Sequence, residues 1–259
     1  MSTEKSTKIN RLLRAQPPGT VMLSSRLAEQ GYNLDLQKRY RKSDWLEPIG
    51  NGAMIRAGDQ VGYEGAIYAL QQIGLSIHPG GKTALSLQGK AHYLEFAAAK
   101  AILFGQAKET LPVWFREHEW QTKVEYHRSS FLPAPLGLID IELKSFSIKV
   151  SSAARAFMEC LYLAPTHQDL LECYELMEGM NNLRPAIVQQ LLEQCNSVKV
   201  KRLFMYMAEK AGHDWLQYLD RQEIDLGKGK RSLVKDGAYN AKYQITVPKE
   251  LESHGKEGV

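Results

Sequence analysis

Residues 21–57 read VMLSSRLAEQGYNLDLQKRYRKSDWLEPIGNGAMIRA, and this stretch decides the fold. Ser24 or Ser25 is expected to cap a first helix, which Gly31 ends by adopting the left-handed conformation. A second helix follows at once, with Asn33 as its N-cap. The order of a helix, a short turn, a basic helix and a hairpin predicts a winged helix-turn-helix.

The second of these helices carries a basic face. At about 100° per residue, Leu36 and Tyr40 fall on the side that packs inward. The side chains expected to face DNA are Gln37, Lys38, Arg39, Arg41 and Lys42. Cations placed so closely repel one another in a free helix, and binding along the phosphates of double-stranded DNA relieves that repulsion. The alternative for an isolated basic run is a solvated helix face.

The hairpin after the basic helix is predicted from Gly50-Asn51-Gly52, a turn signal between two apolar strands. Asn51, at the tip of this wing, is expected to contact DNA, and Arg56 is expected to reach the DNA backbone or minor groove beside the basic helix. The capped helix, the turn and the hairpin all have the right type and spacing, so together they favour DNA contact over a solvated face.

Composition and charge set wider limits. The 259 residues are 44% hydrophobic and 24% charged, which is typical of a soluble globular protein with one large domain or two ordinary ones. The formal net charge is +4. Residues 1–60 hold ten cations and six acidic residues, so the whole formal excess can be assigned to this part of the chain.

The three cysteines, Cys160, Cys173 and Cys195, show no metal-type pair spacing and lie in helical patterns. They are interpreted as buried free thiols in a reducing compartment. The chain shows neither a signal peptide nor an apolar run long enough to cross a bilayer. We therefore expect a cytoplasmic protein with no membrane partner.

The predicted fold is α+β, with an N-terminal winged helix-turn-helix followed by a mixed α/β domain with a sheet and a helical bundle. The expected organisation is a DNA-binding domain at residues 1–60, connecting helices at 61–92 and a C-terminal domain at 93–259. A helix around Ile9 and Leu12 that Pro17 ends should complete the core of the first domain. A further helix should end at Gly74.

The patterns of the second domain predict strands, then helices, then strands. A short helix is expected at 83–87, and the strands expected to form a mixed sheet lie at 93–96, 100–104, 123–127, 136–143 and 146–150. The helices of the bundle should begin at Ser151 or Ser152, Thr166, Arg184-Pro185 and Ser197. Strands at 223–226, 232–235 and 243–247 should precede a disordered, charged C-terminus.

Two short motifs have both a chemical and a structural interpretation. His78-Pro79-Gly80-Gly81-Lys82-Thr83 ends like a phosphate-binding loop but lacks its first glycine, so a glycine turn that caps a helix is favoured. Asp140, Glu142 and Lys144 alternate as in a metal-dependent PD-(D/E)xK nuclease, but no earlier acidic partner is evident, which favours the polar face of an edge strand.

Surface charge offers two further features. Glu172, Glu175 and Glu178 form an acidic stripe that suits a basic protein or a solvated face, and residues 227–231 form a basic turn. The histidines show no paired ligand spacing and no serine lies in a nucleophile elbow. The sequence therefore predicts no enzyme, no metal site and no cofactor.

Long phrases of the chain resemble a known family, the AbiEi-type antitoxins of bacterial type IV toxin-antitoxin (abortive infection) systems. The matching phrases are PPGTV (17–21), LQKRYRKSDWLEPIGNGAMIRAGD (36–59), HPGGKTALSLQGKAHYL (78–94), FSIKVSSAARAFMECLYLAP (146–165) and LLECYELMEGMNNLRPAIVQQLLEQC (170–195). The resemblance covers nearly the whole chain.

This resemblance implies a winged helix that binds inverted repeats in the operator of its own operon and represses it. It also implies a C-terminal domain that counters a toxin similar to a nucleotidyltransferase. A ligand-sensing transcriptional regulator and, less favoured, a PD-(D/E)xK-like nuclease are the alternatives.

Overall fold

The structure is a computed structural model that describes residues 7–89 and 100–253. The strand expected at 93–96 lies outside the described residues. The chain divides into two compact units, and each unit draws on several segments of the sequence. Unit 1 comprises residues 1–78, 98–128 and 140–149, and unit 2 comprises residues 79–97, 129–139 and 150–259.

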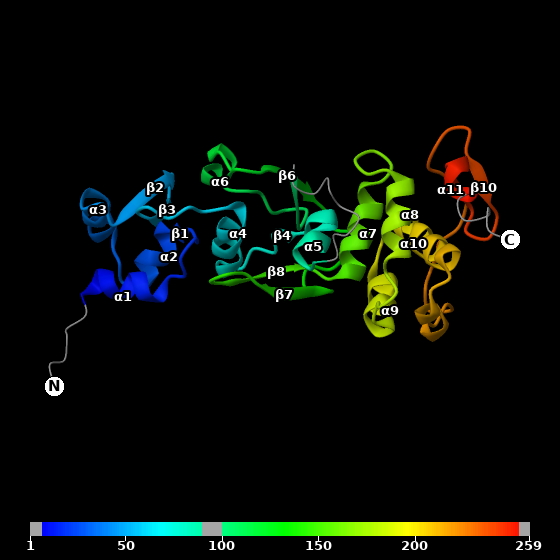
Figure 1. Ribbon diagram of the computed structural model, residues 1–259, viewed down its shortest axis with the longest axis horizontal. Coiled ribbons are helices and arrows are strands. Elements are labelled where there is room, and N and C mark those ends of the chain that lie inside the picture. Colours follow the sequence, from blue (N-terminus) through cyan, green and yellow to red (C-terminus); the bar gives the residue numbers. More distant parts are fainter. Residues whose placement is uncertain (1–6, 90–99, 254–259) are drawn as a thin grey trace. The chain divides into compact units, whose positions relative to one another are not determined.

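Unit 1 begins with the predicted winged helix-turn-helix, drawn in blue in Figure 1. Its elements are α1 (Lys8–Ala15), β1 (Met22–Leu23), α2 (Ser24–Glu29), α3 (Leu34–Lys42), β2 (Leu46–Gly50) and β3 (Ala53–Arg56). The strands pair antiparallel in the order β1-β3-β2, and the β2–β3 hairpin closes through Asn51 and Gly52 as predicted.

An apolar core holds these elements together, and every one of them contributes a buried side chain to it. The buried members are Leu12, Met22, Leu27, Tyr40, Leu46 and Met54, and Ile9, Tyr32 and Leu36 pack against them. Burial of this apolar surface stabilises the segment as one packed body. The first helix therefore completes the core, as its apolar pattern predicted.

Local signals in this segment were mostly interpreted correctly. Asn33 caps α3 by accepting a hydrogen bond from the Leu36 backbone nitrogen, and Gly31 has the expected positive φ of 86°. The predicted N-cap of α2 was wrong. Leu23 occupies that position without a side-chain cap, because the Ser24 hydroxyl donates instead to the Gln37 side chain.

The rest of unit 1 consists of helices and short sheets. α4 (Tyr63–Gln72) stops before Gly74, and α6 (Val113–Glu117) lies between the parallel strands β5 (Lys100–Gly105) and β6 (Lys123–Arg128). These strands form one sheet with β4 (His78–Pro79). A Cβ added to Gly50 would lie 2.7 Å from the Cβ of Trp114, so a glycine is required where α6 packs on the wing.

The prediction that the strands between residues 100 and 151 form one mixed sheet was wrong. Among the described strands, β7 (Leu138–Glu142) and β8 (Ser147–Ser151) pair only with each other. They form a sheet separate from the β4-β5-β6 sheet. Local sequence patterns give each strand's position but not its partner.

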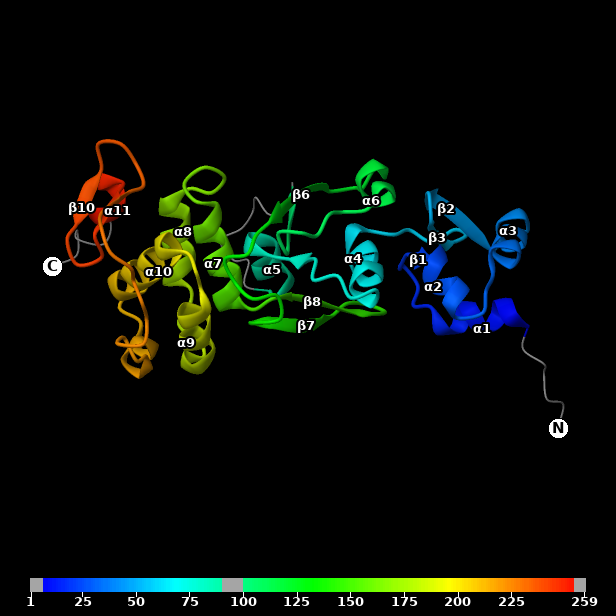
Figure 2. The same cartoon turned by 180° about the vertical axis from the view of Figure 1, so that it is seen from behind.

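Unit 2 contains the predicted helical bundle. Its helices are α5 (Gly81–Leu87), α7 (Ala153–Leu163), α8 (Leu170–Glu178), α9 (Pro185–Gln194) and α10 (Val198–Ala211). Both cartoon views show α7, α8 and α10 side by side, and α7 also packs on α5 and α9 (Figure 2). The bundle therefore centres on α7.

The starts of these helices test the predicted caps. Ser197 caps α10 by accepting from the Val200 nitrogen, and Pro185 begins α9. Ser152 precedes α7 but makes no side-chain cap hydrogen bond. Thr166 was the wrong cap for α8, since Asp169 accepts from the Leu171 and Glu172 nitrogens.

The end of the described chain forms a small sheet. It has the order β10 (Ala238–Asn240), β11 (Ile245–Val247), β9 (Arg231–Ser232), after a 3₁₀ helix, η2 (Asp214–Tyr218). Residues 223–226 are not a strand, which contradicts the prediction. Residues 249–253 were expected to be part of a disordered C-terminus, but they form the helix α11 (Lys249–Ser253). Burial of the Leu251 side chain stabilises this helix.

Three further predictions concern the chain as a whole. Cys160, Cys173 and Cys195 are free and buried, as expected, and burial raises the pKa of each thiol. No helix in the described ranges is long and apolar enough to span a bilayer. The boundaries at 60 and 92 remain a prediction, although unit 1 also contains residues 98–128 and 140–149.

Candidate nucleic-acid interface

Helix α3 presents a row of cations to solvent. Lys38, Arg39 and Lys42 are exposed and Arg41 is half-buried. No ion pair joins any of them to a residue that the structure describes. Because these cations have no ion-pair partner among the described residues, an external polyanion would relieve their mutual repulsion.

The opposite side of α3 anchors the helix in the core. Tyr40 is 9% exposed and belongs to the apolar cluster described above. Burial raises the pKa of Tyr40, with a smaller contribution in the same direction from Tyr32, while Arg39 and Arg11 lower it. The hydroxyl stays neutral at physiological pH, so no phenolate offsets the cationic face.

Gln37 does not lie on the basic face, which corrects the prediction from the helical wheel. Its side chain is 0% exposed. The Nε2 group donates to the backbone oxygens of Ser24 (3.0 Å) and Tyr32 (2.6 Å), and Oε1 accepts from the Ser24 hydroxyl (2.6 Å). Gln37 thus joins α2, the turn and α3, and we exclude it from the candidate interface.

Arg56 also makes hydrogen bonds within the winged helix-turn-helix. Its Nη2 group donates to the backbone oxygens of Leu13 (2.5 Å) and Gln16 (3.2 Å). These oxygens belong to the C-terminal end of α1, where unpaired carbonyls and the helix dipole favour a cation. The structure therefore assigns Arg56 a capping contact in place of the predicted reach toward DNA.

A groove of about 480 Å³ separates α3 from the wing. Lys38 and Arg41 line it on the helix side, and Asn51 lines it at the tip of the hairpin. Leu34 and Asp35, at the start of α3, also line it. Of the predicted site residues, the structure brings Lys38, Arg41 and Asn51 together around one groove, whereas Arg39 and Lys42 lie on the exposed helix surface outside it.

Sequence reasoning missed Leu34. Its side chain is 67% exposed although it is large and apolar. The signal was present, since Leu34 directly follows the N-cap and precedes Lys38 by one helical turn.

The loop that resembles a phosphate site is occupied by the protein itself. Gly80 is the N-cap of α5, and the Gly81 backbone nitrogen donates to Oε2 of Glu159 at 3.0 Å. Lys82 pairs with Glu172 at 2.6 Å. A carboxylate thus takes the helix N-terminus that would bind a phosphate, which supports the interpretation as a capping turn.

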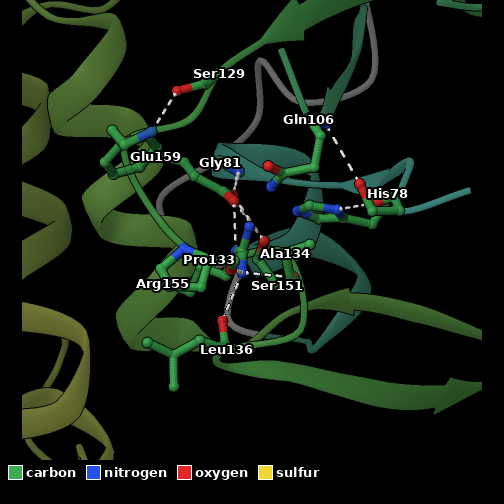
Figure 3. A network of polar contacts seen from close by, with 12 residues as sticks. His78, Gly81, Gln106, Ser129, Pro133, Ala134, Leu136, Ser151, Arg155 and Glu159 are labelled. Atoms are coloured by element: carbon green, nitrogen blue, oxygen red, sulfur yellow. Dashed lines mark hydrogen bonds and ion pairs between the residues drawn. The ribbon is translucent and has the colours of Figure 1, made fainter. Parts of the chain in front are cut away.

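Glu159 is the centre of a buried polar network in unit 2 (Figure 3). It accepts hydrogen bonds from the Ser151 hydroxyl (2.7 Å) and from Nε of Arg155 (3.0 Å). The Arg155 Nη1 group donates in turn to three backbone oxygens, those of Pro133, Ala134 and Leu136. Glu159 is 0% exposed and Arg155 is 3% exposed, so this network joins segments and is not an open site.

The candidate nuclease residues do not form a metal site in the described part of the chain. Asp140 pairs with Lys149 at 3.1 Å, and no group of three or more histidine, cysteine or acidic side chains among the described residues is placed to hold a metal ion. Asp140 and Glu142 are exposed residues of β7, and Lys144 is exposed in the turn before β8, so a solvated polar surface accounts for all three.

Two family models of known proteins match the chain. One, described as "Transcriptional regulator, AbiEi antitoxin, Type IV TA system", matches residues 98–248, and the other, described as "Transcriptional regulator, AbiEi antitoxin N-terminal domain", matches residues 5–96. The chain belongs to the AbiEi antitoxin family. This membership confirms the resemblance that the long sequence phrases indicated.

A solved structure supports the fold of this AbiEi-family chain. The crystal structure of the RV2827C protein from Mycobacterium tuberculosis superposes with a TM-score of 0.56 at 11% sequence identity and covers 95% of this chain and 91% of the other. At that identity the likeness concerns the fold alone. No curated protein matched the chain.

Proposed function

We propose that this AbiEi-family regulator binds double-stranded DNA in the operator of its own operon through α3 and the wing, and so represses that operon. The unpaired cations of α3 beside the wing groove carry the proposal. An α-helix fits the major groove of DNA, and lysine and arginine side chains bind phosphates and guanine edges there. The family's description as transcriptional regulators supports this role.

We further propose that the protein counters a nucleotidyltransferase-like toxin through residues 93–259. The membership of a type IV antitoxin family supports this part of the proposal. The proposal does not require direct contact between antitoxin and toxin, so co-expression of the two proteins tests it before any binding experiment.

Lys38→Ala and Arg41→Ala test the DNA-binding proposal. Each variant should weaken binding to a labelled duplex from the region upstream of the protein's own gene, because each removes a charge from the groove. The slope of log affinity against log salt concentration should become less negative by about 1 for each phosphate that the variant no longer binds. Affinity is measured by fluorescence anisotropy at several salt concentrations.

Lys108→Ala is the matched control, because Lys108 is an exposed cation of unit 1 outside the winged helix. It should leave both affinity and salt dependence unchanged. If Lys38→Ala and Arg41→Ala bind the duplex as tightly as the unmodified protein, α3 is not the DNA-binding element.

A further inference from the structure

Leu34 is a solvent-exposed apolar side chain at the N-terminal end of α3, before the cations of that helix. Its exposed fraction is 67%, and it is the first residue of α3. Residues 34, 38 and 41 are spaced i, i+4 and i+7, which places Leu34 on the same helix face as Lys38 and Arg41. All three side chains line the groove between α3 and the wing.

The core does not account for this exposure. Leu36, Tyr40 and their neighbours already fill the inward side of α3. Other exposed large apolar side chains of the described residues, such as Trp45 and Ile73, lie outside the groove. A single exposed leucine needs no functional explanation by itself. Leu34 differs from the others in that it lines the same groove as Lys38, Arg41 and Asn51.

The chemistry of the major groove offers an apolar partner. The first residues of a recognition helix contact base edges, whereas cations on the same helix hold the phosphates. Among the groups that bases present in the major groove, the C5-methyl of thymine is the apolar one. A leucine at the first position of the helix, one turn before Lys38 on the same helix face, fits that methyl group better than it fits a polar base edge.

We propose that Leu34 is a specificity-determining residue that packs on the C5-methyl group of an operator thymine. The inference rests on the proposed DNA binding and adds a base contact to it. Lys38 and Arg41 then supply affinity for the backbone, and Leu34 supplies discrimination between sequences.

Replacing thymine with uracil removes only the methyl group, so it tests this contact directly. The upstream duplex is amplified with either dTTP or dUTP, and the full-length protein is titrated into each. The unmodified protein should bind the thymine duplex about four-fold more tightly for each methyl group contacted, which is the effect of burying one such group. Leu34→Ala should discriminate between the two duplexes about four-fold less than the unmodified protein does for each methyl contact of Leu34 that is lost.

Two variants separate a methyl contact from other effects. Leu34→Met keeps an apolar side chain of similar volume and should retain most of the discrimination. Ile73→Ala removes an exposed apolar side chain outside the groove and should retain all of it. Circular dichroism checks that each variant is folded.

The outcomes distinguish this inference from the proposed function. If the unmodified protein binds neither duplex, both are overturned. If it binds thymine and uracil duplexes equally, or if Leu34→Ala discriminates between them as strongly as the unmodified protein, the DNA-binding proposal stands and the role of Leu34 is overturned.

Discussion

Gln37 shows how one buried amide organises the helix-turn-helix. Its side chain makes hydrogen bonds to Ser24 and Tyr32 and has no exposed surface. These partners lie on α2 and in the turn, so the amide fixes the angle at which α3 leaves the turn. The geometry of the basic face depends on this contact although Gln37 does not belong to that face.

Gln37→Ala should lower the free energy of unfolding by about 1–3 kcal/mol, because the substitution leaves buried backbone oxygens without their donor. Urea unfolding followed by circular dichroism measures the change. Gln30→Ala replaces an exposed glutamine at the end of α2 and should change the stability by less than about 0.5 kcal/mol. Equal stability of the two variants would show that the buried amide adds nothing.

Predictions of local roles gave mixed results, since Asn33 and Ser197 cap their helices as predicted but Thr166 does not cap α8. Roles that depend on a distant partner were missed. Asn33 and Gly31 act on their own helix ends, and both were predicted correctly. Gln37 and Arg56 look like surface residues on a helical wheel or a strand, but backbone oxygens far away in the chain hold them. Periodicity sorts residues by polarity and cannot reveal such partners.

At the scale of elements, the same limit applies to sheets. The sequence patterns indicated the positions of β5, β6, β7 and β8, but they did not show that β5 pairs parallel with β6 in one sheet and β7 with β8 in another. Strand pairing depends on tertiary contacts between segments, and α6 between β5 and β6 gave too weak a signal to indicate a crossover. The winged helix was predicted nearly completely because adjacent elements make up most of its core.

Arg202 is the anchor of the C-terminal sheet. It is 2% exposed, and its guanidinium group donates to four backbone oxygens, those of Leu226, Gly227, Gly229 and Gln244. No described acidic side chain forms an ion pair with it. One buried side chain of α10 thus holds the basic turn and β11.

Arg202→Met should loosen this region while the rest of unit 2 stays folded. The methionine keeps much of the apolar volume but loses donors that each contribute about 1.5–3 kcal/mol as charged hydrogen bonds. Hydrogen exchange at residues 226–247 should become faster, and trypsin should cleave at Lys228 or Lys230 sooner. Arg202→Lys, with a single ammonium group, should give an intermediate effect; unchanged exchange in the methionine variant would contradict the anchor role.

At the scale of the whole molecule, the two proposed roles belong to different parts of the chain. Unit 1 is built from three separate segments, one of which extends to residue 149. A truncation near residue 92 would remove β5 and β6 from unit 1, so it would not isolate the DNA-binding part cleanly. Point variants are the sharper way to separate the roles.

The double variant Lys38→Ala with Arg41→Ala should fail to repress but should still counter the toxin. The adjacent toxin gene and the variant are expressed from unrelated promoters, so that loss of repression does not alter the toxin level. Growth reports neutralisation, and a reporter fused to the natural operator reports repression. Loss of growth rescue at equal protein levels would show that DNA binding and neutralisation share residues of α3.

The tip of the wing has a dipeptide, Asn51-Gly52, whose chemistry changes the charge of the proposed interface with time. Asn51 precedes Gly52 in an exposed two-residue turn. In such a dipeptide the backbone nitrogen of the glycine attacks the asparagine side-chain carbonyl, ammonia leaves, and a cyclic succinimide forms. Water then opens the succinimide to aspartate or isoaspartate. Each deamidated molecule would thereby gain a negative charge facing the phosphates, which would lower its affinity for the operator. Newly synthesised repressor would then bind the operator more tightly than older, deamidated repressor.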